Sequence, residues 1–395
     1  MTPYTRRYLL AHGAYLAVGL ALLAWYGLTP GQALARFDGQ HYLQIASSGY
    51  VRRLTFLADG KPARMNIAFF PLYPWLMAAV HAVTRLPMEI AGLVVSLLAA
   101  LATAVGLGVL LEPLFGRRTA LWTVTIWAVG VDAIVQSMLY AQPVIAAFAV
   151  WGAVAIRRRK PLLGAACAIG AGLSHSTGLG LIVVVMAGAA LLLRESASKQ
   201  QWRATLAPAA AFVLAPMGLV GYIAFLAVRF HRADAWFLAE SAPGWSSEFD
   251  LGKYSAQILT GQLDTTDWFA PNGVPHLVAS LWIVPMAAVM LWLLRDQGWW
   301  PRRYRPTRSL GDRPPVPWEL TVFSLVTFAV ILTNSGPWGS KPRFLIPCLA
   351  LCVPPAIWLG RLDHRPRAQQ AIVLGIATVS VLCSAYLVGP SPSAL

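Results

Sequence analysis

The sequence predicts an all-α integral membrane protein, a polytopic bundle of about eleven transmembrane helices that forms one domain over residues 1–395. Hydrophobic residues make up 57% of the chain and charged residues only 12%, whereas soluble domains are nearer a quarter charged. A water-soluble core cannot absorb this excess of apolar surface, so lipid must surround the chain. Long uncharged runs recur along the whole sequence, and each predicts a helix.

The first predicted helix covers residues 8–28, which carry no charge and are long enough to span a bilayer. Arg6 and Arg7 precede it. A cleaved signal peptide ending at residues 33–35, "ALA", is the alternative interpretation. The apolar run exceeds the roughly 7–15 residues typical of a signal peptide, which favours a retained helix.

Ten further apolar segments follow, and two of them are short for a span. Residues 67–83 form an additional, ambiguous segment because Pro71 and Pro74 interrupt its start. We expect this segment to lie in the outer interface or to re-enter it without crossing. The ten segments are 89–111, 119–130, 138–155, 161–173, 177–194, 205–228, 275–295, 317–333, 342–360 and 368–388.

The net charge of +15 invites a nucleic-acid interpretation, but its distribution argues against one. If residues 67–83 do not cross, the N-terminus is cytoplasmic and 20 of the 31 Lys and Arg residues face the cytoplasm, as the positive-inside rule requires. The charge therefore indicates multi-pass topology in a cell membrane, with lipids as partners and no nucleic acid. The inner residues are Arg6, Arg7, Arg117, Arg118, Arg157 to Lys160, Arg194, Lys199, Arg203, the basic residues from Arg295 to Arg313, Arg361, Arg365 and Arg367.

This topology leaves two long extracytoplasmic loops, residues 29–66 and 229–274, in which we expect short interfacial helices. The first loop contains "RFDGQHY", residues 36–42. A carboxylate near lipid is costly, so Asp38 should face water or a protein cavity. Arg36, His41 and Tyr42 add hydrogen-bonding groups and are candidate substrate ligands. A helix cap or a solvated loop charge is the alternative role for Asp38.

These residues carry a resemblance to a known family. "RFDGQHYLQIASSGY" at residues 36–50, followed by "NIAFFPLYP" at 66–74, resembles the signature of bacterial PIG-V-like mannosyltransferases of the GT-C glycosyltransferase superfamily. Weaker similarity follows in the expected order over most of the chain. It lies in "APMGLVGYIAFL" at 215–226, "DAWFLAESAPGW" at 234–245 and "KPRFLIPCLAL" at 341–351.

Three positions depart from the family pattern. Phe37 replaces the usual Trp, Gln142 in "LYAQP" replaces an acid, and His175 in "SHSTG" replaces a common Arg. These changes affect the expected identity of donor and acceptor. Gln142 and His175 remain candidate substrate ligands.

The resemblance implies an inverting transfer of a sugar, mannose in the family, from a polyprenyl-phosphate donor to an acceptor hydroxyl on the extracytoplasmic face. The acceptor would be a glycan, a lipid or a protein. One carboxylate suffices as general base, and Asp38 would take this role. The lipid phosphate needs positive charge or hydrogen-bond donors as it leaves.

The candidate phosphate ligands are Arg343 and Lys341, at the outer start of segment 342–360, with Arg64 and His175 behind them. An interfacial anchor is the alternative role for Arg343, and packing is the alternative for His175. Tyr50, Tyr73 and Trp75 are either packing residues or sugar-stacking residues. No metal site is expected from the sequence, which lacks a DxD motif and a His cluster at ligand spacing, although a divalent cation stays open.

Two other classes of protein compete with the enzyme. A lipid or sugar transporter or flippase would place ionisable residues at mid-bilayer and show repeat symmetry. A GT-C-like assembly partner without activity would keep the fold but not the chemistry. Ionisable residues are nearly absent from the middle of the predicted spans, and the polar residues gather at one interface. This pattern favours the enzyme over the transporter.

Overall fold

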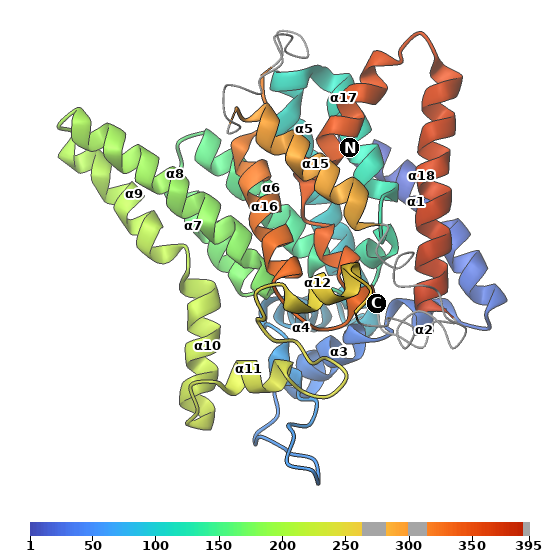
Figure 1. The fold of residues 1–395 in the computed structure, drawn as a ribbon, viewed down its shortest axis with the longest axis vertical. Coiled ribbons are helices and arrows are strands. Elements are labelled where there is room, and N and C mark those ends of the chain that lie inside the picture. The colour runs from blue at the N-terminus through green and yellow to red at the C-terminus, as the bar shows by residue number, and fades with distance from the viewer. Residues whose placement is uncertain (263–281, 299–313, 390–395) are drawn as a thin grey trace.

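The computed structural model describes residues 1–262, 282–298 and 314–389, and these ranges form helices and turns without a β-strand (Figure 1). The end of the second loop, part of segment 275–295 and most of the basic cluster near residue 305 lie outside these ranges. The α-helices are α1 (Pro3–Trp25), α2 (Pro30–Leu34), α3 (Asp38–Ser48), α4 (Leu72–Thr84), α5 (Met88–Val129), α6 (Gln142–Arg157), α7 (Pro161–Gly172), α8 (Leu179–Ser198), α9 (Trp202–Leu214), α10 (Met217–Phe230), α11 (Ala235–Glu240), α12 (Lys253–Leu259), α15 (Ile283–Asp296), α16 (Trp318–Leu332), α17 (Val353–Arg361) and α18 (Pro366–Val388). Short 3-10 turns are η1 (Asn66–Ala68), η2 (Ala133–Ser137), η3 (Ser176–Gly178), η5 (Trp338–Ser340), η6 (Pro342–Leu345) and η7 (Leu349–Cys352).

Apolar helices of membrane-spanning length confirm the all-α membrane fold. Within the described ranges, four helices are long and apolar enough to span a bilayer, or up to six if each of two bent pairs counts as one span. The helices α4, α6, α7 and α16 are apolar but shorter. The expected number of eleven crossings therefore stays a prediction. The four long helices are Pro3–Trp25, Met88–Val129, Ser176–Ser198 and Pro366–Val388.

Helix α5 contains the two segments that the sequence separates as 89–111 and 119–130. Its 42 residues are interrupted at Gly116, whose φ of 80° and ψ of 159° are not helical. An L-residue with a side chain rarely adopts this conformation, so glycine permits the turn between the two arms. Arg117 and Arg118 follow directly, which places basic residues at this turn.

Segment 342–360, expected as one continuous helix, is broken. The stretches Trp338–Leu345 and Leu349–Arg361 are bent by 76° relative to each other, and 3-10 turns replace the start of the helix. Prolines at 342, 347, 354 and 355 explain the break, because proline removes a backbone donor and clashes with the preceding helical turn. The expectation of a continuous helix after Arg343 is wrong for this reason.

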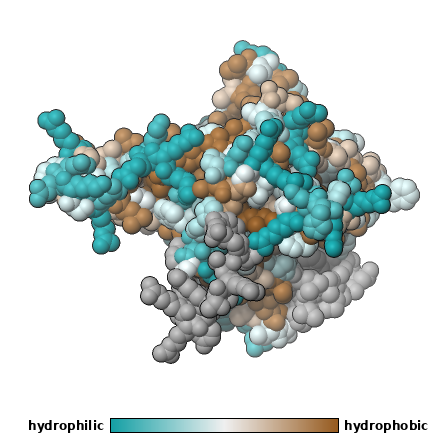
Figure 2. All heavy atoms as spheres, turned by 90° about the horizontal axis from the view of Figure 1, so that it is seen from above, coloured by the Kyte–Doolittle hydropathy of each residue, from teal (hydrophilic) through white to brown (hydrophobic). Residues whose placement is uncertain are grey.

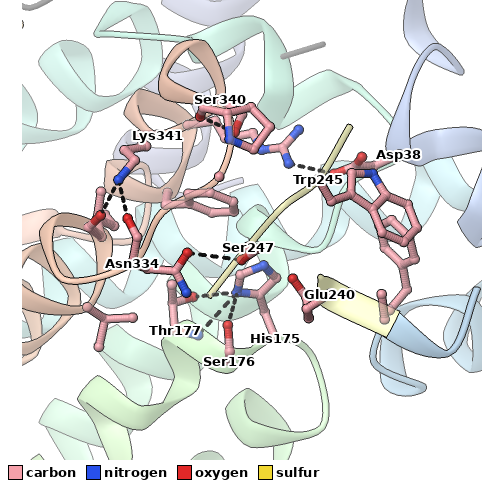
Figure 3. Close-up of a pocket in the computed structure, with 18 of the residues that line it drawn as sticks. Asp38, His175, Ser176, Thr177, Glu240, Trp245, Ser247, Asn334, Ser340 and Lys341 are labelled. Carbon is pink, nitrogen blue, oxygen red and sulfur yellow. Dashed lines mark hydrogen bonds and ion pairs between the residues drawn. The ribbon is translucent and has the colours of Figure 1, made fainter. Parts of the chain in front are cut away.

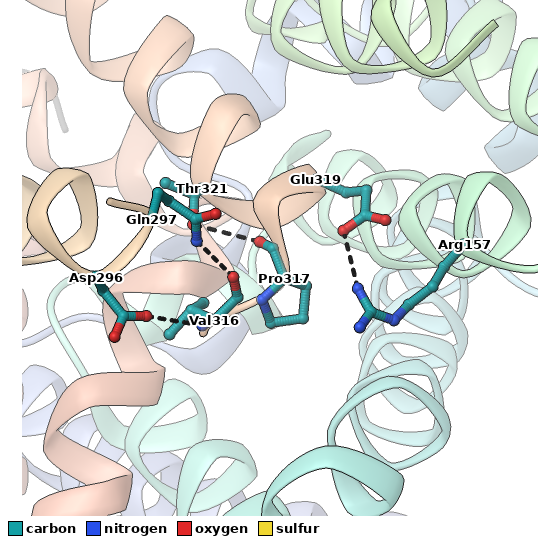
Figure 4. Close-up of polar contacts among 7 residues, drawn as sticks. All are labelled: Arg157, Asp296, Gln297, Val316, Pro317, Glu319 and Thr321. Carbon is teal, nitrogen blue, oxygen red and sulfur yellow. Dashed lines mark hydrogen bonds and ion pairs between the residues drawn. The ribbon is translucent and has the colours of Figure 1, made fainter. Parts of the chain in front are cut away.

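Ion pairs join several basic turns at one end of the bundle. Arg118 at the turn of α5 pairs with Asp363 between α17 and α18, and Arg159 after α6 pairs with Glu195 near the end of α8. Arg157 also contacts Glu319 at the start of α16, where the termini of α15 and α16 are hydrogen-bonded (Figure 4). Figure 2 views the molecule from this end and shows hydrophilic residues spread over it. The basic turns therefore share one end of the bundle, and the cytoplasmic location of this end stays a prediction.

The first loop lies at the opposite end of the bundle with α2, α3, α11 and α12 (Figure 1). Residues 67–83 form part of η1 and most of α4. At 13 residues, α4 is too short to span the hydrocarbon core alone. Helix α4 packs against α5, and α11 packs against η1. The second loop is therefore docked on the first, and the two loops build one surface.

Candidate functional site

A cavity of about 140 Å³ lies where the two loops meet the bundle (Figure 3). It is large enough for several water molecules. Its walls come from six segments of the sequence: α3, the stretch 68–70, the start of α6 at Gln142, the stretch 175–177, the second loop, and the stretch from Val330 to Phe344. Of the candidate residues, the structure brings Asp38, Tyr42, Gln142, His175, Lys341 and Arg343 to this cavity.

Asp38 is positioned by the first turn of α3. Phe37, just before the helix, has a positive φ of 56°, which is rare for a bulky residue. Gly39 follows, and a Cβ there would lie 3.2 Å from the Cβ of Leu139, so α3 needs glycine to approach the chain before α6 this closely. The helix N-terminus favours a carboxylate in its first turn. The sequence thus holds the Asp38 carboxylate at the cavity wall.

Arg343 forms an ion pair with Asp38, with 2.6 Å between Nη2 and Oδ2. The side chains are only 8% and 15% exposed, respectively. Arg343 Nη1 also donates a hydrogen bond of 3.2 Å to the Tyr140 hydroxyl, and its guanidinium lies 4.9 Å from the centre of the Phe344 ring. The guanidinium is therefore held firmly beside the candidate base, and it lines the same cavity.

Lys341 lines the cavity, but its ammonium group is occupied by backbone carbonyls. Nζ donates hydrogen bonds to Ile331 O at 2.8 Å and to Asn334 O at 2.5 Å. These carbonyls lie at the C-terminal end of α16, where a cation satisfies unpaired carbonyl groups. In Figure 3 the ammonium points away from Asp38. The geometry favours a capping role for Lys341, and its role as a phosphate ligand stays a prediction.

His175 lines the cavity as a neutral side chain. Its Nδ1 accepts a hydrogen bond of 3.1 Å from the Thr177 backbone N–H, which leaves the proton on Nε2. Burial, together with the nearby Arg343 charge, lowers the pKa of His175 to about 3. His175 can therefore offer a hydrogen-bond donor to a ligand, but it cannot replace the positive charge of an arginine.

Five candidates lie outside the cavity wall, and the first three donate hydrogen bonds to backbone carbonyls of other segments. Arg36 donates to the carbonyls of Val388 and Gly389 at the end of α18. Arg64 donates to Pro243 O at 2.8 Å and so joins the two loops. The Tyr50 hydroxyl donates to Phe69 O at 2.8 Å. Tyr73 is fully buried, with its hydroxyl on Gly92 O and Ser96 Oγ, and His41 stacks on Phe69 at 4.7 Å.

Four of these residues therefore join different segments of the chain by hydrogen bonds: Arg36, Arg64, Tyr50 and Tyr73. Trp75, the third aromatic considered for sugar stacking, is 55% exposed and lies outside the cavity wall. Direct substrate contacts by these residues stay predictions.

The cavity also contains residues that the sequence reasoning did not select. Glu240 at the end of α11, Trp245 and Ser247 come from the second loop, and Asn334 follows α16. Glu240 is partly exposed to the cavity but closely surrounded by protein, and this desolvation raises the pKa of its carboxyl to about 8. The weak family resemblance at residues 234–245 was the sequence signal available for Glu240, but it did not distinguish this residue from the other acidic residues of the loop.

No cluster of three or more His, Cys, Asp and Glu residues able to hold a metal ion occurs in the described ranges. A divalent cation in the reaction, which the sequence leaves open, stays an open alternative.

Comparison with solved structures shows the fold. The structure of ArnT from Cupriavidus metallidurans bound to undecaprenyl phosphate aligns with 94% of this chain at 16% identity and a TM-score of 0.50. This chain covers 63% of the ArnT chain, so it spans less than two thirds of that protein's length. The similarity confirms the all-α membrane fold. At this identity it shows the fold alone.

Two further structures align over most of this chain with lower scores. Archaeal oligosaccharyltransferase AglB from Archaeoglobus fulgidus, in complex with an inhibitory peptide and a dolichol-phosphate, has 12% identity and a TM-score of 0.47 over 96% of this chain and 55% of its own. Arabinosyltransferase EmbB from Mycobacterium smegmatis has 17% identity and a TM-score of 0.48 over 88% of this chain and 30% of its own. No family model and no curated protein matches the sequence.

Proposed function

We propose that this protein is an inverting glycosyltransferase that moves a sugar, mannose, from a polyprenyl-phosphate donor to an acceptor hydroxyl on the extracytoplasmic face of the cell membrane. The observation that carries the proposal is the pairing of Asp38 with Arg343 in the wall of one cavity. A candidate base and a candidate phosphate ligand, distant in sequence, are adjacent in space. The PIG-V-like motif around Asp38 supports mannose as the sugar.

The reaction needs one carboxylate. The acceptor oxygen attacks the anomeric carbon, and Asp38 takes the hydroxyl proton as general base, a contribution of about 10²–10⁴-fold. The bond between the anomeric carbon and the phosphate oxygen breaks, and its electron pair leaves with the lipid phosphate. A single displacement inverts the anomeric centre, so a carboxylate nucleophile is not required.

Arg343 supplies positive charge to the leaving phosphate. A guanidinium presents a planar fork that can bind two phosphate oxygens at once. Its low exposure means that such bonds form in a site with little water, where they stabilise developing charge more strongly than in bulk solvent. His175 lines the same cavity as a neutral side chain that can donate a hydrogen bond.

Fold and topology are consistent with a lipid-linked donor. ArnT, which has this fold, was solved with undecaprenyl phosphate bound. The basic turns joined by ion pairs lie at the opposite end of the bundle from the first loop (Figures 1 and 2). With those turns in the cytoplasm, the first loop and the cavity that it lines would face the extracytoplasmic side.

Product analysis tests this proposal. Purified protein is incubated with undecaprenyl-phosphate-linked mannose and a mixture of glycan and lipid acceptors, and the products are identified by mass spectrometry. We expect a new glycosidic bond with inverted anomeric configuration and release of undecaprenyl phosphate. In liposomes, movement of the mannosyl lipid between leaflets without a new bond would instead identify a transporter. If neither sugar transfer nor movement of the lipid is observed, the result favours an assembly partner without activity.

A further inference from the structure

Glu240 is a second carboxyl group in the wall of the cavity. It is the last residue of α11, and α11 packs against η1 of the first loop. Asp38 has a cationic partner in Arg343. Within the part of the chain that the structure describes, no cation lies at ion-pair distance from Glu240. The mechanism proposed above does not use this residue, so its place in the cavity needs another explanation.

Polar groups extend from Glu240 across the cavity wall. The Ser247 backbone N–H donates a hydrogen bond of 3.0 Å to the backbone carbonyl of Glu240. The Ser247 hydroxyl donates another, also of 3.0 Å, to Asn334 Oδ1. This second bond joins the second loop to the chain after α16. Gln142 adds a buried carbonyl oxygen, Oε1, that has no hydrogen-bond partner in the described residues. An unpaired buried acceptor is costly unless a ligand supplies the donor.

An aromatic surface lies in the same cavity wall. Trp245 and Phe69 both line the cavity, and their rings meet edge to face with centroids 5.4 Å apart. His41 stacks on Phe69 and meets Trp245 edge to face with ring centroids 5.3 Å apart, so it packs against both rings. A carboxyl, an amide and a hydroxyl beside indole and phenyl rings suit a ligand with a polar rim and apolar ring faces.

We propose that Glu240 binds ring hydroxyl groups of a saccharide in this cavity, with Trp245 as the apolar wall and Gln142 as a further acceptor. This inference rests on the proposed function and deepens it, because it assigns the residues that recognise the sugar. The sugar is either that of the donor or that of a glycan acceptor, and both present the same polyhydroxylated ring.

The protonation of Glu240 gives the interaction a pH signature. Desolvation is the main cause that raises the pKa of Glu240 to about 8; the Asp38 charge acts in the same direction, whereas a hydrogen bond with the Ser247 hydroxyl and the Arg343 charge oppose it. His175 also lines the cavity and stays neutral through this range. Below about pH 8 the Glu240 carboxyl therefore carries a proton and both donates and accepts hydrogen bonds. Glutamine has the same capacity at every pH.

Lipid binding by the purified full-length chain tests the donor arm. Undecaprenyl phosphate and undecaprenyl-phosphate-linked mannose are compared, and the ratio of their affinities measures recognition of the sugar. We expect the wild type to prefer the mannosyl lipid and Glu240→Ala to reduce this preference by about 10-fold. Glu240→Gln should keep the same preference at pH 6.5 and pH 9, whereas the wild-type preference should change between these two pH values as Glu240 loses its donor proton. Glu248→Ala, an exposed acid of the same loop, is the matched control.

The acceptor arm uses the KM of a glycan acceptor in the transfer assay. A higher acceptor KM for Glu240→Ala, with the lipid preference intact, would assign the site to the acceptor sugar. An unchanged lipid preference together with an unchanged acceptor KM would overturn the inference while leaving the transfer reaction in place. If the wild type binds neither lipid and transfers no sugar, the proposed function fails and this inference fails with it.

Discussion

Replacing Arg343 should affect the donor reaction more strongly than any change of an exposed charge. In Arg343→Ala, the guanidinium that lies 2.6 Å from Asp38 and lines the cavity is lost. A charge-assisted contact to a phosphate in a largely dry site contributes about 2–4 kcal/mol, which corresponds to roughly 30- to 1,000-fold in kcat/KM for the donor. Arg343→Lys keeps the charge but loses the fork, so its loss should be smaller.

The same substitution also removes the partner of Asp38. Breaking a buried ion pair by deleting one member costs about 3–5 kcal/mol of stability, because the remaining charge is uncompensated. Thermal unfolding in detergent must therefore accompany the kinetics, and activity must be expressed per folded protein. Arg118→Ala is the matched control, since its ion pair with Asp363 is exposed, at 56% and 46%, and lies at the other end of the bundle. An exposed pair contributes at most about 1 kcal/mol.

The assay measures kcat and KM for undecaprenyl-phosphate-linked mannose with the acceptor saturating. If folded Arg343→Ala keeps both constants within a few-fold of the wild type, Arg343 only anchors Asp38 and the broken segment after α16. The phosphate would then have to be bound elsewhere in the cavity, with His175 Nε2 as the next donor. A loss in Arg343→Lys as large as in Arg343→Ala would favour the geometry of the fork over the charge.

Three further predictions concern the base, the topology and the packing of α10. Asp38→Asn should reduce turnover by about 10²–10⁴-fold while the protein still folds, because Asn can still accept a hydrogen bond from Arg343; near-normal turnover of a folded variant would exclude Asp38 as the base. The Asp59 side chain is 52% exposed, so the thiol of Asp59→Cys should react with a membrane-impermeant maleimide from outside the cell. Labelling from the cytoplasmic side alone would show that the topology is the reverse of the one proposed. Gly218→Ala should lower the free energy of unfolding by about 1–3 kcal/mol, because the new Cβ would lie 2.1 Å from Ile169 O. Gly221→Ala in the same helix is the control: its Cβ meets no atom within 4 Å, so the change should be neutral or stabilising. Equal effects of the two substitutions would show that α10 does not pack tightly on α7.

Composition and hydropathy were enough to predict the fold class, because lipid solvation leaves few alternatives to helices. The break in segment 342–360 was less accessible. Its four prolines were visible in the sequence, but apolar length alone favoured a continuous span. Gly116 shows the opposite case, in which the expected boundary between two spans coincides with a residue that can turn the chain.

The site could be predicted only one residue at a time. Asp38 and Arg343 were each selected for their chemistry, but their contact depends on how α3 packs against the chain before α6 and on the bend after α16. Lys341 and Arg343 are two residues apart, yet their side chains bind different partners because 3-10 turns direct them apart. Glu240 resembles other acids of its loop in sequence. Only its packing beside the cavity sets it apart, and periodicity contains no information on that packing.

The ion pair between Asp38 and Arg343 links the two halves of the proposed reaction. Before transfer, the guanidinium is shared between the Asp38 carboxylate and a donor phosphate with one negative charge. As the acceptor hydroxyl gives its proton to Asp38, that carboxylate becomes neutral and its attraction for Arg343 weakens. Negative charge grows on the leaving phosphate during the same step, so the guanidinium can follow the charge without a large movement. A base with no cationic neighbour would leave the cavity with two unneutralised negative groups when the donor is bound. The proximity of the pair thus gives a physical reason why one arginine can serve both as the partner of the base and as the ligand of the leaving group.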